Sequence, residues 1–266
     1  MPVLSQMELR FIIALAARKR CIPKTGDIKQ AFCQSSLPPD ENYICRPPPG
    51  CPVTPPNTYW KLKKTLYGLK RSPRHFYELA TKLLLSLGLK QHPLSPCLFS
   101  GSIIKNKPPL YLGLYVDDFI YFSKDKSVET TFEQEFSKKI DIDFNGQVSC
   151  FLGIKFNAVK HDDGEVDILM NQPAFIKHLA HTAGLSDVTT IPTAPYRNGF
   201  PMDSIPTPTI HNNDQDKLTK TMHQLVGSLN WLAISTRPNI STITNMIVKY
   251  TSAPSKQHIQ AAKQVI

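Results

Sequence analysis

Two adjacent carboxylates, Asp117 and Asp118, stand between apolar runs at residues 110–116 and 119–122. No basic residue follows until Lys124, so no neighbour in sequence neutralises either carboxylate. A strand-turn-strand interpretation places both at the tip of a hairpin, with apolar residues along each arm. Rigidly held carboxylates suit a divalent cation, because Mg²⁺ prefers hard oxygen ligands. An ordinary acidic hairpin turn explains the dipeptide equally well, so the rest of the chain has to decide between the two.

A third carboxylate, Asp27, opens a short segment after a turn at residues 24–26. The expected order of strand, helix, two strands, helix and strand is typical of an α+β layer, with helices on one face of a mostly antiparallel sheet. Asp27 then lies on a different strand from Asp117 and Asp118, and the three can converge. Such a group suits a two-metal site, in which one cation activates a hydroxyl and the other stabilises the leaving oxygens of an in-line phosphoryl displacement.

Residues 60–82 form a basic segment with interleaved aromatic side chains and a single acid, Glu78. Its cations are Lys61, Lys63, Lys64, Lys70, Arg71, Arg74 and Lys82. Cations that meet phosphates, together with aromatics that pack on sugars or bases, are typical of a nucleic-acid track. The alternative is a solvated helix face with its aromatic residues in the core, and we favour that alternative for Phe76. For Lys70 and Arg71, which follow a glycine turn, we favour a phosphate or nucleotide role.

The bulk composition narrows the class of protein. The chain has 266 residues and a formal net charge of +10, which favours a polyanionic partner such as nucleic acid. The six cysteines lack Cys-x-x-Cys spacing, so we expect reduced thiols in an intracellular protein, either cytoplasmic or nuclear. The apolar run at residues 11–17 is too short to span a membrane, and basic residues follow it, so we predict neither a signal peptide nor a membrane partner.

Hydrophobic periodicity gives the expected elements. Helices are predicted at residues 5–19, 73–87, 127–136 with a Ser127 cap, 173–183, 214–234, 240–251 and 255–266. Strands are predicted at residues 43–45, 59–63, 97–104, 110–122, 150–156 and 166–169. A connector rich in Pro, Thr and Asn covers residues 184–213.

Four blocks in fixed order carry a family resemblance: residues 27–32, 63–74, 114–119 and 151–154, which contain Asp-Ile-Lys-Gln-Ala-Phe, Leu-Tyr-Gly-Leu-Lys, Tyr-Val-Asp-Asp and Phe-Leu-Gly-Ile. Together with two later blocks, at 225–232 and 236–240, they closely resemble the reverse transcriptase of copia-type LTR retrotransposons. The resemblance implies a right-hand polymerase fold. It also implies an RNA-directed DNA polymerase that extends a primer on an RNA or DNA template, using dNTPs and Mg²⁺ or Mn²⁺.

The resemblance assigns roles to the carboxylates and to one aromatic residue. Asp27, Asp117 and Asp118 match the catalytic, metal-binding aspartates, and Ile28 would offer its backbone carbonyl to a cation. Phe32 matches the bulky residue that closes under the sugar and disfavours a 2′-hydroxyl. A core aromatic is the alternative interpretation of Phe32.

Further positions match the substrate-binding parts of the family. Those expected to line the nucleotide and template, besides Phe32, are Tyr67, Gly68 and Lys70. Those expected to contact nucleic acid are Lys63, Lys64, Arg71 and Arg74 from the basic segment, and Phe151, Leu152 and Gly153 from a primer-gripping hairpin whose apolar residues also pack. Lys138 and Lys139 are candidates for the general acid that protonates pyrophosphate, although a solvated helix end explains them equally well.

The resemblance also predicts how the chain is divided. Residues 1–160 would hold partial fingers and the palm, 161–190 a thumb-like hairpin and helix, 191–213 a linker, and 214–266 a helical connection region that ends before ribonuclease H. Basic residues that hold the triphosphate in the family would precede Met1. We therefore expect a fragment of a Pol polyprotein whose other domains include integrase and ribonuclease H.

Three functions are compatible with this pattern. The first is an RNA-directed DNA polymerase core. The second is a catalytically inactive nucleic-acid-binding remnant that keeps the basic groove but cannot hold dNTPs. The third is a different Mg²⁺-dependent phosphohydrolase, against which the block at residues 64–73 argues, because a hydrolase needs no template-side segment.

Overall fold

The computed structural model describes residues 1–51, 55, 58–186, 194 and 213–266. The chain divides into two units, of which the first comprises Met1–Phe151 with Ala158–Ile168 and the second comprises Leu152–Asn157 with Leu169–Ile266. Each unit has a hydrophobic core of its own. Apart from positions 194 and 213, the predicted linker at residues 191–213 lies outside the described residues.

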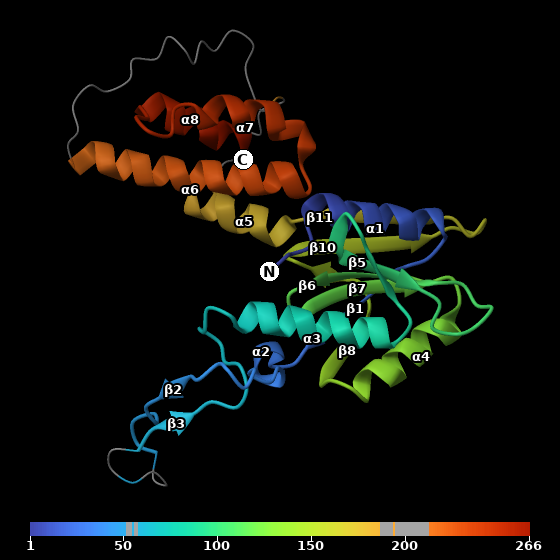
Figure 1. Cartoon of the computed structure of the whole chain (residues 1–266). Helices are drawn as coiled ribbons and strands as arrows, with labels where there is room; N and C mark the ends of the chain where they lie inside the picture. Colours follow the sequence, from blue (N-terminus) through green and yellow to red (C-terminus); the bar gives the residue numbers. More distant parts are fainter. Residues whose placement is uncertain (52–54, 56–57, 187–193, 195–212) are drawn as a thin grey trace. The chain divides into compact units, whose positions relative to one another are not determined.

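A six-stranded antiparallel sheet forms the centre of the first unit, in the order β4-β5-β6-β7-β1-β8 (Figure 1). Its strands are β4 (Lys90–His92), β5 (Ser95–Gly101), β6 (Leu110–Tyr115), β7 (Asp118–Ser123), β1 (Lys24–Ile28) and β8 (Ile142–Gln147). The mixture of helices with antiparallel sheets confirms the expected α+β class. The order also brings β1, from the start of the chain, between two strands that come about a hundred residues later.

Helices cover both faces of this sheet, so the prediction that they lie on one face is wrong (Figure 1). On one face, α3 (Ser72–Ser86) and α4 (Lys126–Ser137) bury their apolar stripes in one core, in which Phe132 of α4 contacts both Phe119 and Tyr121 of β7. On the other face lies α1 (Gln6–Arg18), which contacts β6. A Cβ built on Gly113 of β6 would lie 3.3 Å from side-chain atoms of Leu4 and Ile120, so the chain leading into α1 packs closely on this face. The helices predicted at residues 5–19 and 73–87 are therefore confirmed, and the helical spacing of their apolar residues gives each helix one buried stripe.

The start of α4 differs from the prediction. Asp125, and not Ser127, is the N-cap: its Oδ1 accepts a hydrogen bond from the Ser127 backbone N–H at 2.8 Å and another from the Ser127 hydroxyl at 2.7 Å. Both residue types are good N-caps, so local preference alone did not separate them. The helix consequently begins one residue earlier than predicted, at Lys126.

Strand β8 was not predicted, although it lies beside β1. Its residues alternate between half-buried and exposed, but Asn145 and Gly146 weaken the strand signal. Pairing with β1 supplies the missing preference, with Asp27 opposite Asp143 and Ile28 opposite Ile142. Two other unpredicted elements in this unit are β4 and the short helix α2 (Ala31–Gln34), and β2 (Ile44–Cys45) pairs with β3 (Trp60–Lys61) as a separate ribbon.

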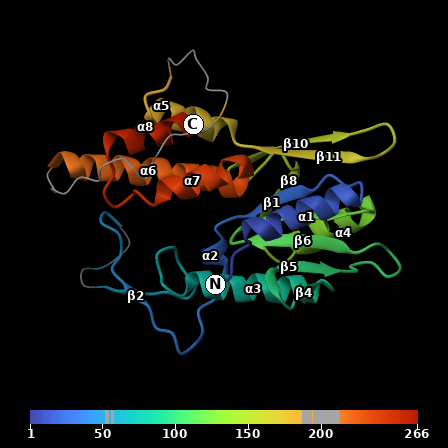
Figure 2. The ribbon, with the colours of Figure 1, turned by 90° about the horizontal axis from the view of Figure 1, so that it is seen from above.

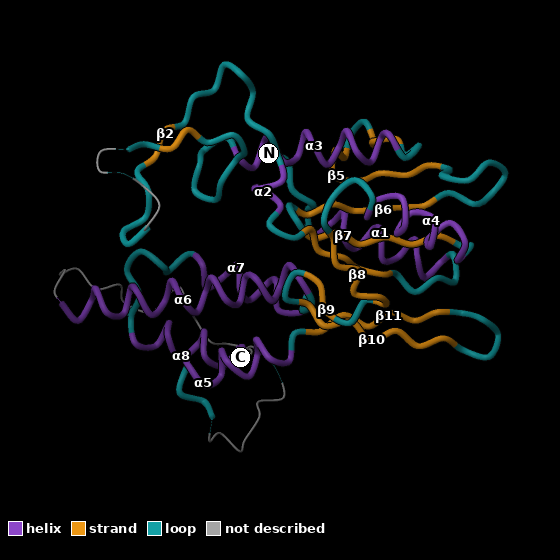
Figure 3. Tube along the Cα trace, turned by 90° about the horizontal axis from the view of Figure 1, so that it is seen from below, coloured by secondary structure: helices purple, strands orange, loops and turns teal. Residues whose placement is uncertain are grey.

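The strand predicted at 150–156 is broken by a turn. Leu152 and Gly153 have φ angles of +51° and +74°, so the chain turns between β9 (Cys150–Phe151) and β10 (Ile154–Lys160). Two successive residues with positive φ are typical of a tight hairpin turn. With β11 (Val166–Asn171), these strands form a three-stranded sheet in the order β11-β10-β9. Strands β10 and β11 lie side by side as a hairpin (Figure 3).

The second unit is mainly helical (Figure 2). Its helices are α5 (Pro173–Thr182), α6 (Asn213–Ser235), the 3₁₀ helix η2 (Pro238–Ile240), α7 (Ser241–Val248) and α8 (Lys256–Val265). Leu179 and Ala183, at the C-terminal end of α5, share one core with Met222, Leu229 and further residues from α6 to α8. Across the described part of the chain, every helix is too short or too polar to cross a membrane.

Candidate active site

The turn between β6 and β7 holds the two adjacent carboxylates. Tyr115 pairs with Asp118, which leaves Val116 and Asp117 as a two-residue loop. Val116 has a φ of +54°, a conformation that a β-branched residue rarely adopts. Such a backbone costs about 1–3 kcal/mol and persists only where the surrounding structure enforces it. The strain identifies this turn as a candidate functional element.

Strand β1 brings Asp27 to the same place. Asp27 lies directly opposite Asp118 on β7 and directly opposite Asp143 on β8. Residues that face each other across antiparallel strands point to the same side of the sheet, with Cβ atoms about 5 Å apart. The backbone N–H of Ile28 also donates a 2.9 Å hydrogen bond to the carbonyl of Asp117, which ties the turn to β1. Three carboxylates therefore form a row across β7, β1 and β8, with Asp117 at its end.

Two of the carboxylates, Asp27 and Asp118, have a raised affinity for protons. Burial, the charge of Asp117 and the charge of Asp27 together raise the pKa of Asp118 to about 6. Burial raises the pKa of Asp27 as well, with additional contributions from Asp117 and Asp143. Like charges at this separation oppose ionisation unless a cation joins them. The site is thus electrostatically suited to hold positive charge.

Protein cations do not compensate the predicted catalytic carboxylates. In the described chain, no Lys, Arg or His nitrogen lies within 4.0 Å of a carboxylate oxygen of Asp27, Asp117 or Asp118. The cation associated with the row is Lys29, whose Nζ lies 2.8 Å from Asp143 and 3.8 Å from Asp141. Sequence reasoning missed Asp143 and Lys29, and the available signal was the alternation of residues 142–147 that marks β8 as a strand.

The donor set fits a divalent cation in type and charge. Carboxylate and carbonyl oxygens are the ligands that Mg²⁺ prefers. Burial and, after it, repulsion between carboxylates raise the pKa values of Asp27 and Asp118, and a bound cation would oppose both effects. Among the described residues, however, no three His, Cys, Asp or Glu side chains are grouped closely enough to hold a metal ion. The structure therefore shows the carboxylates aligned by strand pairing but not closed into a ligand shell.

Two of the predicted nucleotide-site residues are in ring contact. Phe32, half-buried at the start of α2, has its ring centroid 4.7 Å from that of Tyr67 and 6.0 Å from that of Phe76. Phe76 is fully buried, in agreement with the core interpretation favoured for it. Gly68 follows Tyr67 with a φ of +94°, and the N–H of Leu69 bonds to the carbonyl of Leu66. This geometry is typical of a type II turn, whose third position requires glycine.

The basic segment contains paired and unpaired cations. Lys63, Lys64 and Lys70 are exposed, and none of the three lies within 4.0 Å of a carboxylate oxygen in the described chain. Arg71 differs, because its Nη1 lies 2.9 Å from Glu41. Arg74 pairs with Glu78 at 2.8 Å, one helical turn away. The three lysines consequently have the charge most readily available to a phosphate backbone.

The remaining predicted residues lie away from this cluster in sequence. Phe151 is buried at the end of β9, and Leu152 and Gly153 form the turn that follows. Lys138 and Lys139 are exposed at the end of α4, and Lys138 pairs with Glu135 at 2.6 Å. This pairing is what a solvated helix end would give.

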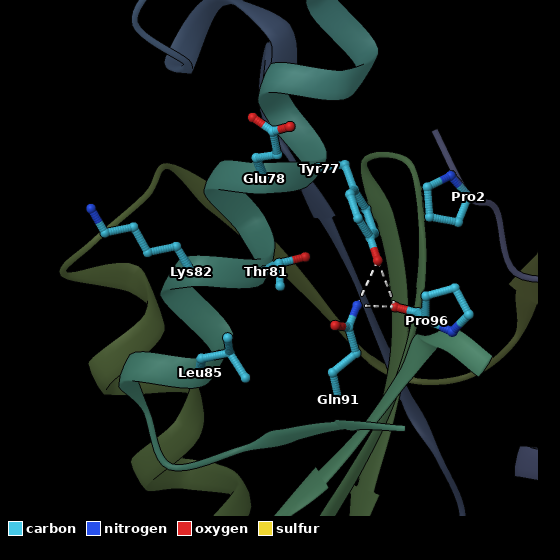
Figure 4. A pocket seen from close by; sticks show the side chains of 8 residues that line it. All are labelled: Pro2, Tyr77, Glu78, Thr81, Lys82, Leu85, Gln91 and Pro96. Carbon is cyan, nitrogen blue, oxygen red and sulfur yellow. Dashed lines mark hydrogen bonds between the residues drawn. The ribbon is translucent and has the colours of Figure 1, made fainter. Parts of the chain in front are cut away.

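A separate groove of about 560 Å³ lies beside α3 and contains none of the predicted site residues (Figure 4). The Tyr77 hydroxyl donates to the carbonyl of Pro96 at 2.9 Å, and the Gln91 side-chain amide donates to both groups. These bonds tie α3 to β4 and β5. They explain the polar end of the groove as a structural contact.

The chain is similar to known proteins along its length. The family model described as "Reverse transcriptase (RNA-dependent DNA polymerase)" matches residues 1–196. The "Retrovirus-related Pol polyprotein from transposon RE1" of Arabidopsis thaliana is 27% identical, over 100% of this chain and 17% of the relative. The corresponding polyprotein from transposon TNT 1-94 of Nicotiana tabacum is 25% identical, over 100% of this chain and 20% of the relative. The "Putative transposon Ty5-1 protein" of Saccharomyces cerevisiae is 26% identical, over 90% of this chain and 73% of the relative. The chain thus spans about a fifth of the two plant polyproteins.

Proposed function

The chain belongs to the reverse transcriptase (RNA-dependent DNA polymerase) family, and we propose that it is the catalytic core of an RNA-directed DNA polymerase. It would extend a primer with dNTPs by two-metal-ion nucleotidyl transfer. The observation that carries the proposal is the direct opposition of Asp27 and Asp118 beside the strained turn at Val116. In the part of the chain that the structure describes, no protein cation pairs with either carboxylate. A fold gains nothing from such a repulsive arrangement, whereas a metal site needs it.

In this proposal Asp27, Asp117 and Asp118 hold Mg²⁺ or Mn²⁺, with the backbone carbonyl of Ile28 as a further oxygen ligand. When bound, the cations would lower the pKa of the primer 3′-hydroxyl and neutralise charge on the departing pyrophosphate. The protein's own contribution is alignment. The pairing of β1 with β7 fixes Asp27 against Asp118, and the bond from Ile28 N–H to Asp117 fixes the turn.

The substrate-binding residues surround that site in the proposal. Phe32, Tyr67, Gly68 and Lys70 would line the dNTP, with Phe32 closing under the sugar. Lys63, Lys64, Arg71 and Arg74 would bind the template or primer backbone, and Phe151, Leu152 and Gly153 would contact the primer. The exposure of Lys63, Lys64 and Lys70 supports the phosphate role, since charge that is not already paired can replace counterions on nucleic acid.

The proposal also assigns polymerase subdomains to the two units of the chain. The first unit would provide the palm and partial fingers, and the second would provide the start of the thumb and the helical connection region. The relatives from plants are polyproteins of greater length. We propose that integrase and ribonuclease H domains of such a polyprotein act with this chain, inside the cell and without a membrane partner.

Primer extension tests the proposal. The purified chain is given a primed RNA homopolymer, the complementary dNTP and Mg²⁺, and the control is the double variant Asp117→Asn Asp118→Asn. Incorporation above that control is expected. Incorporation no greater than the control would contradict the catalytic proposal for this chain. Salt-sensitive binding of the primed template without incorporation would instead support the catalytically inactive nucleic-acid-binding remnant.

A further inference from the structure

Tyr67 occupies an unusual place for a large aromatic residue. Its side chain is 51% exposed, yet its ring contacts Phe32 with centroids 4.7 Å apart and planes inclined by 50°. Tilted ring pairs at this distance attract each other more than the burial of their area alone would give. Such a ring is not a core residue, and its contact with Phe32 therefore calls for another explanation.

Phe32 contacts two aromatic rings of different character. Phe76 meets it edge-on at 6.0 Å and is fully buried in the core of the first unit. Tyr67 contacts it from a solvent-exposed turn. Without Tyr67, the Phe32 ring would keep its contact with Phe76 but lose the contact with the Tyr67 ring. Side-chain rotamers in a packed site are fixed by the neighbours that they contact, so this loss would free the Phe32 ring to move.

The turn that carries Tyr67 is anchored to the segment that carries Phe32. The hydroxyl of Thr65 hydrogen-bonds to the Phe32 carbonyl, and the backbone N–H of Thr65 bonds to the Ser35 carbonyl at 2.9 Å. Ser36 and Lys64 form a β-bridge between the same segments. The two rings therefore belong to one tied structure, and their contact is not an accident of two independent surface loops.

The phenol of Tyr67 also lies within the electrostatic reach of the carboxylates. Its pKa is raised by burial of the hydroxyl and by the negative charges of Asp117, Cys33 and Asp27, while a backbone hydrogen bond from Ala31 opposes the rise. Tyr67 therefore contacts Phe32 and also responds to the charges of two of the three predicted catalytic carboxylates.

We propose that Tyr67 is a positioning residue for sugar selection, whose ring holds Phe32 in the place where it excludes a ribonucleotide 2′-hydroxyl. The inference rests on the proposed polymerase function and adds a second residue to the discrimination expected of Phe32. Tyr67 acts through Phe32. The contact of the Tyr67 ring with the Phe32 ring provides the effect, and the Tyr67 hydroxyl is secondary. Discrimination by a packed pocket is modest in energy, so we expect loss of Tyr67 to reduce it by roughly tenfold.

The test compares Tyr67→Ala, Tyr67→Phe and a matched control, Leu66→Ala, which truncates an exposed side chain in the same turn. Single-nucleotide incorporation gives kcat/KM for a dNTP and for the corresponding rNTP on a primed template with Mg²⁺. Tyr67→Ala should lower the dNTP-to-rNTP ratio by roughly tenfold, with most of the change in rNTP incorporation. Tyr67→Phe and Leu66→Ala should leave the ratio within about twofold of the unaltered chain.

Two results would overturn the inference while leaving the polymerase proposal intact. One is an equal loss of dNTP and rNTP incorporation in Tyr67→Ala, which indicates a merely structural role. The other is a Leu66→Ala variant that shifts the ratio as far as Tyr67→Ala does.

A second measurement applies if the unaltered chain does not incorporate nucleotides. Competition between dATP and ATP for a fluorescent dATP analogue then gives the binding ratio for each variant. Loss of the dATP preference in Tyr67→Ala alone would support the inference even though the polymerase proposal had failed. An unchanged preference, or no binding of either nucleotide, would overturn the inference.

Discussion

The two ends of strand β1 carry charge in opposite ways. At one end, the Nζ of Lys24 lies 2.9 Å from Glu133 and 3.2 Å from Glu129, both on α4. Glu133 also accepts a 2.6 Å hydrogen bond from the Tyr121 hydroxyl, and Glu129 accepts one from the Ser123 backbone at 3.0 Å. Every charge at this end has a partner, and the network joins β1, β7 and α4.

At the other end, three residues along, Asp27 faces Asp118 and Asp143, and no Lys, Arg or His nitrogen of the described residues lies within 4.0 Å of its carboxylate. Because successive residues of a strand alternate between faces, Lys24 points to the face that α4 covers and Asp27 to the opposite face. The same strand therefore contains a balanced network that serves the fold and an unbalanced one that costs the fold stability. The difference teaches that compensation, and not the number of charges, separates structural ionic groups from candidate functional ones.

The largest expected effect comes from removing charge at the unbalanced end. Loss of an outer-shell partner in a metal site typically costs about 10- to 100-fold in activity. Asp27 is a direct ligand in the proposal, so Asp27→Asn should lower the rate of primer extension by more than this. The folded chain should become no less stable, since a repulsive charge has gone. Primer-extension rates and urea denaturation check the two parts.

A matched control for this variant is Asp141→Asn, since Asp141 is an exposed carboxylate near the same sheet edge. It should retain most of the primer-extension activity. Equal losses of activity in the two variants would remove the distinction between Asp27 and ordinary surface acids.

Breaking the balanced end should give the reverse pattern. Glu133→Gln removes one charge from Lys24 and weakens the bond from Tyr121, which should reduce the free energy of unfolding by about 1–3 kcal/mol. Glu135→Gln, which affects only an exposed pair with Lys138, should change it by less than about 1 kcal/mol. Urea denaturation measures the free energy of unfolding of both variants. A Glu133→Gln chain as stable as the Glu135→Gln control would contradict a structural role for the network.

The pH dependence of stability should also reveal the unbalanced end. The pKa of Asp118 is raised from an ordinary value of 3.8 to about 6, so between these values the folded chain binds more protons than the unfolded chain. The stability contributed by this group is therefore fully present below about pH 4 and is lost as the pH rises through about 6. Thermal denaturation in EDTA from pH 4 to 7 should show a decline that is smaller in Asp118→Asn. An identical decline in both chains would contradict the raised pKa.

The smallest effect extends the comparison to the basic segment. Lys64 has no carboxylate neighbour among the described residues, whereas Arg74 pairs with Glu78 at 2.8 Å. Lys64→Ala should therefore reduce the slope of log affinity against log salt for a primed template by about 1, the value for one phosphate contact. Arg74→Ala should reduce it by less, because Glu78 already offsets part of that charge. Filter-binding titrations at several salt concentrations measure the slope for each variant. Equal slopes for Lys64→Ala and Arg74→Ala would contradict the distinction between unpaired and paired cations.

Much of this arrangement was accessible from the sequence, because several elements have strong local signals. The stripes of α1 and α3 follow helical spacing, and the two apolar runs around Asp117 and Asp118 form the predicted hairpin. Motif order predicted the copia-type Pol resemblance, which the family match and the relatives confirm.

The other features of the fold and the site depend on pairing between segments that are distant in sequence, and local sequence patterns do not predict such pairing. Strand β8 has weak strand preference of its own and forms against β1, so the position of Asp143 opposite Asp27 was not predicted. The contact of Tyr67 with Phe32 likewise depends on a bridge between residues 36 and 64. These tertiary contacts override local propensity, as they commonly do in sheets.

Binding of a divalent cation to the unbalanced carboxylates tests the central claim most directly. Thermal denaturation of the unaltered chain, without nucleic acid or nucleotide, is measured against Mg²⁺ and Mn²⁺ concentration, in parallel with Asp27→Asn. Saturable stabilisation is predicted for the unaltered chain, reaching about 2.7 kcal/mol at a hundred times the dissociation constant, and it should be lost in Asp27→Asn. Equal stabilisation of both chains, or none in the unaltered chain, would contradict the claim that Asp27, Asp117 and Asp118 form a metal site.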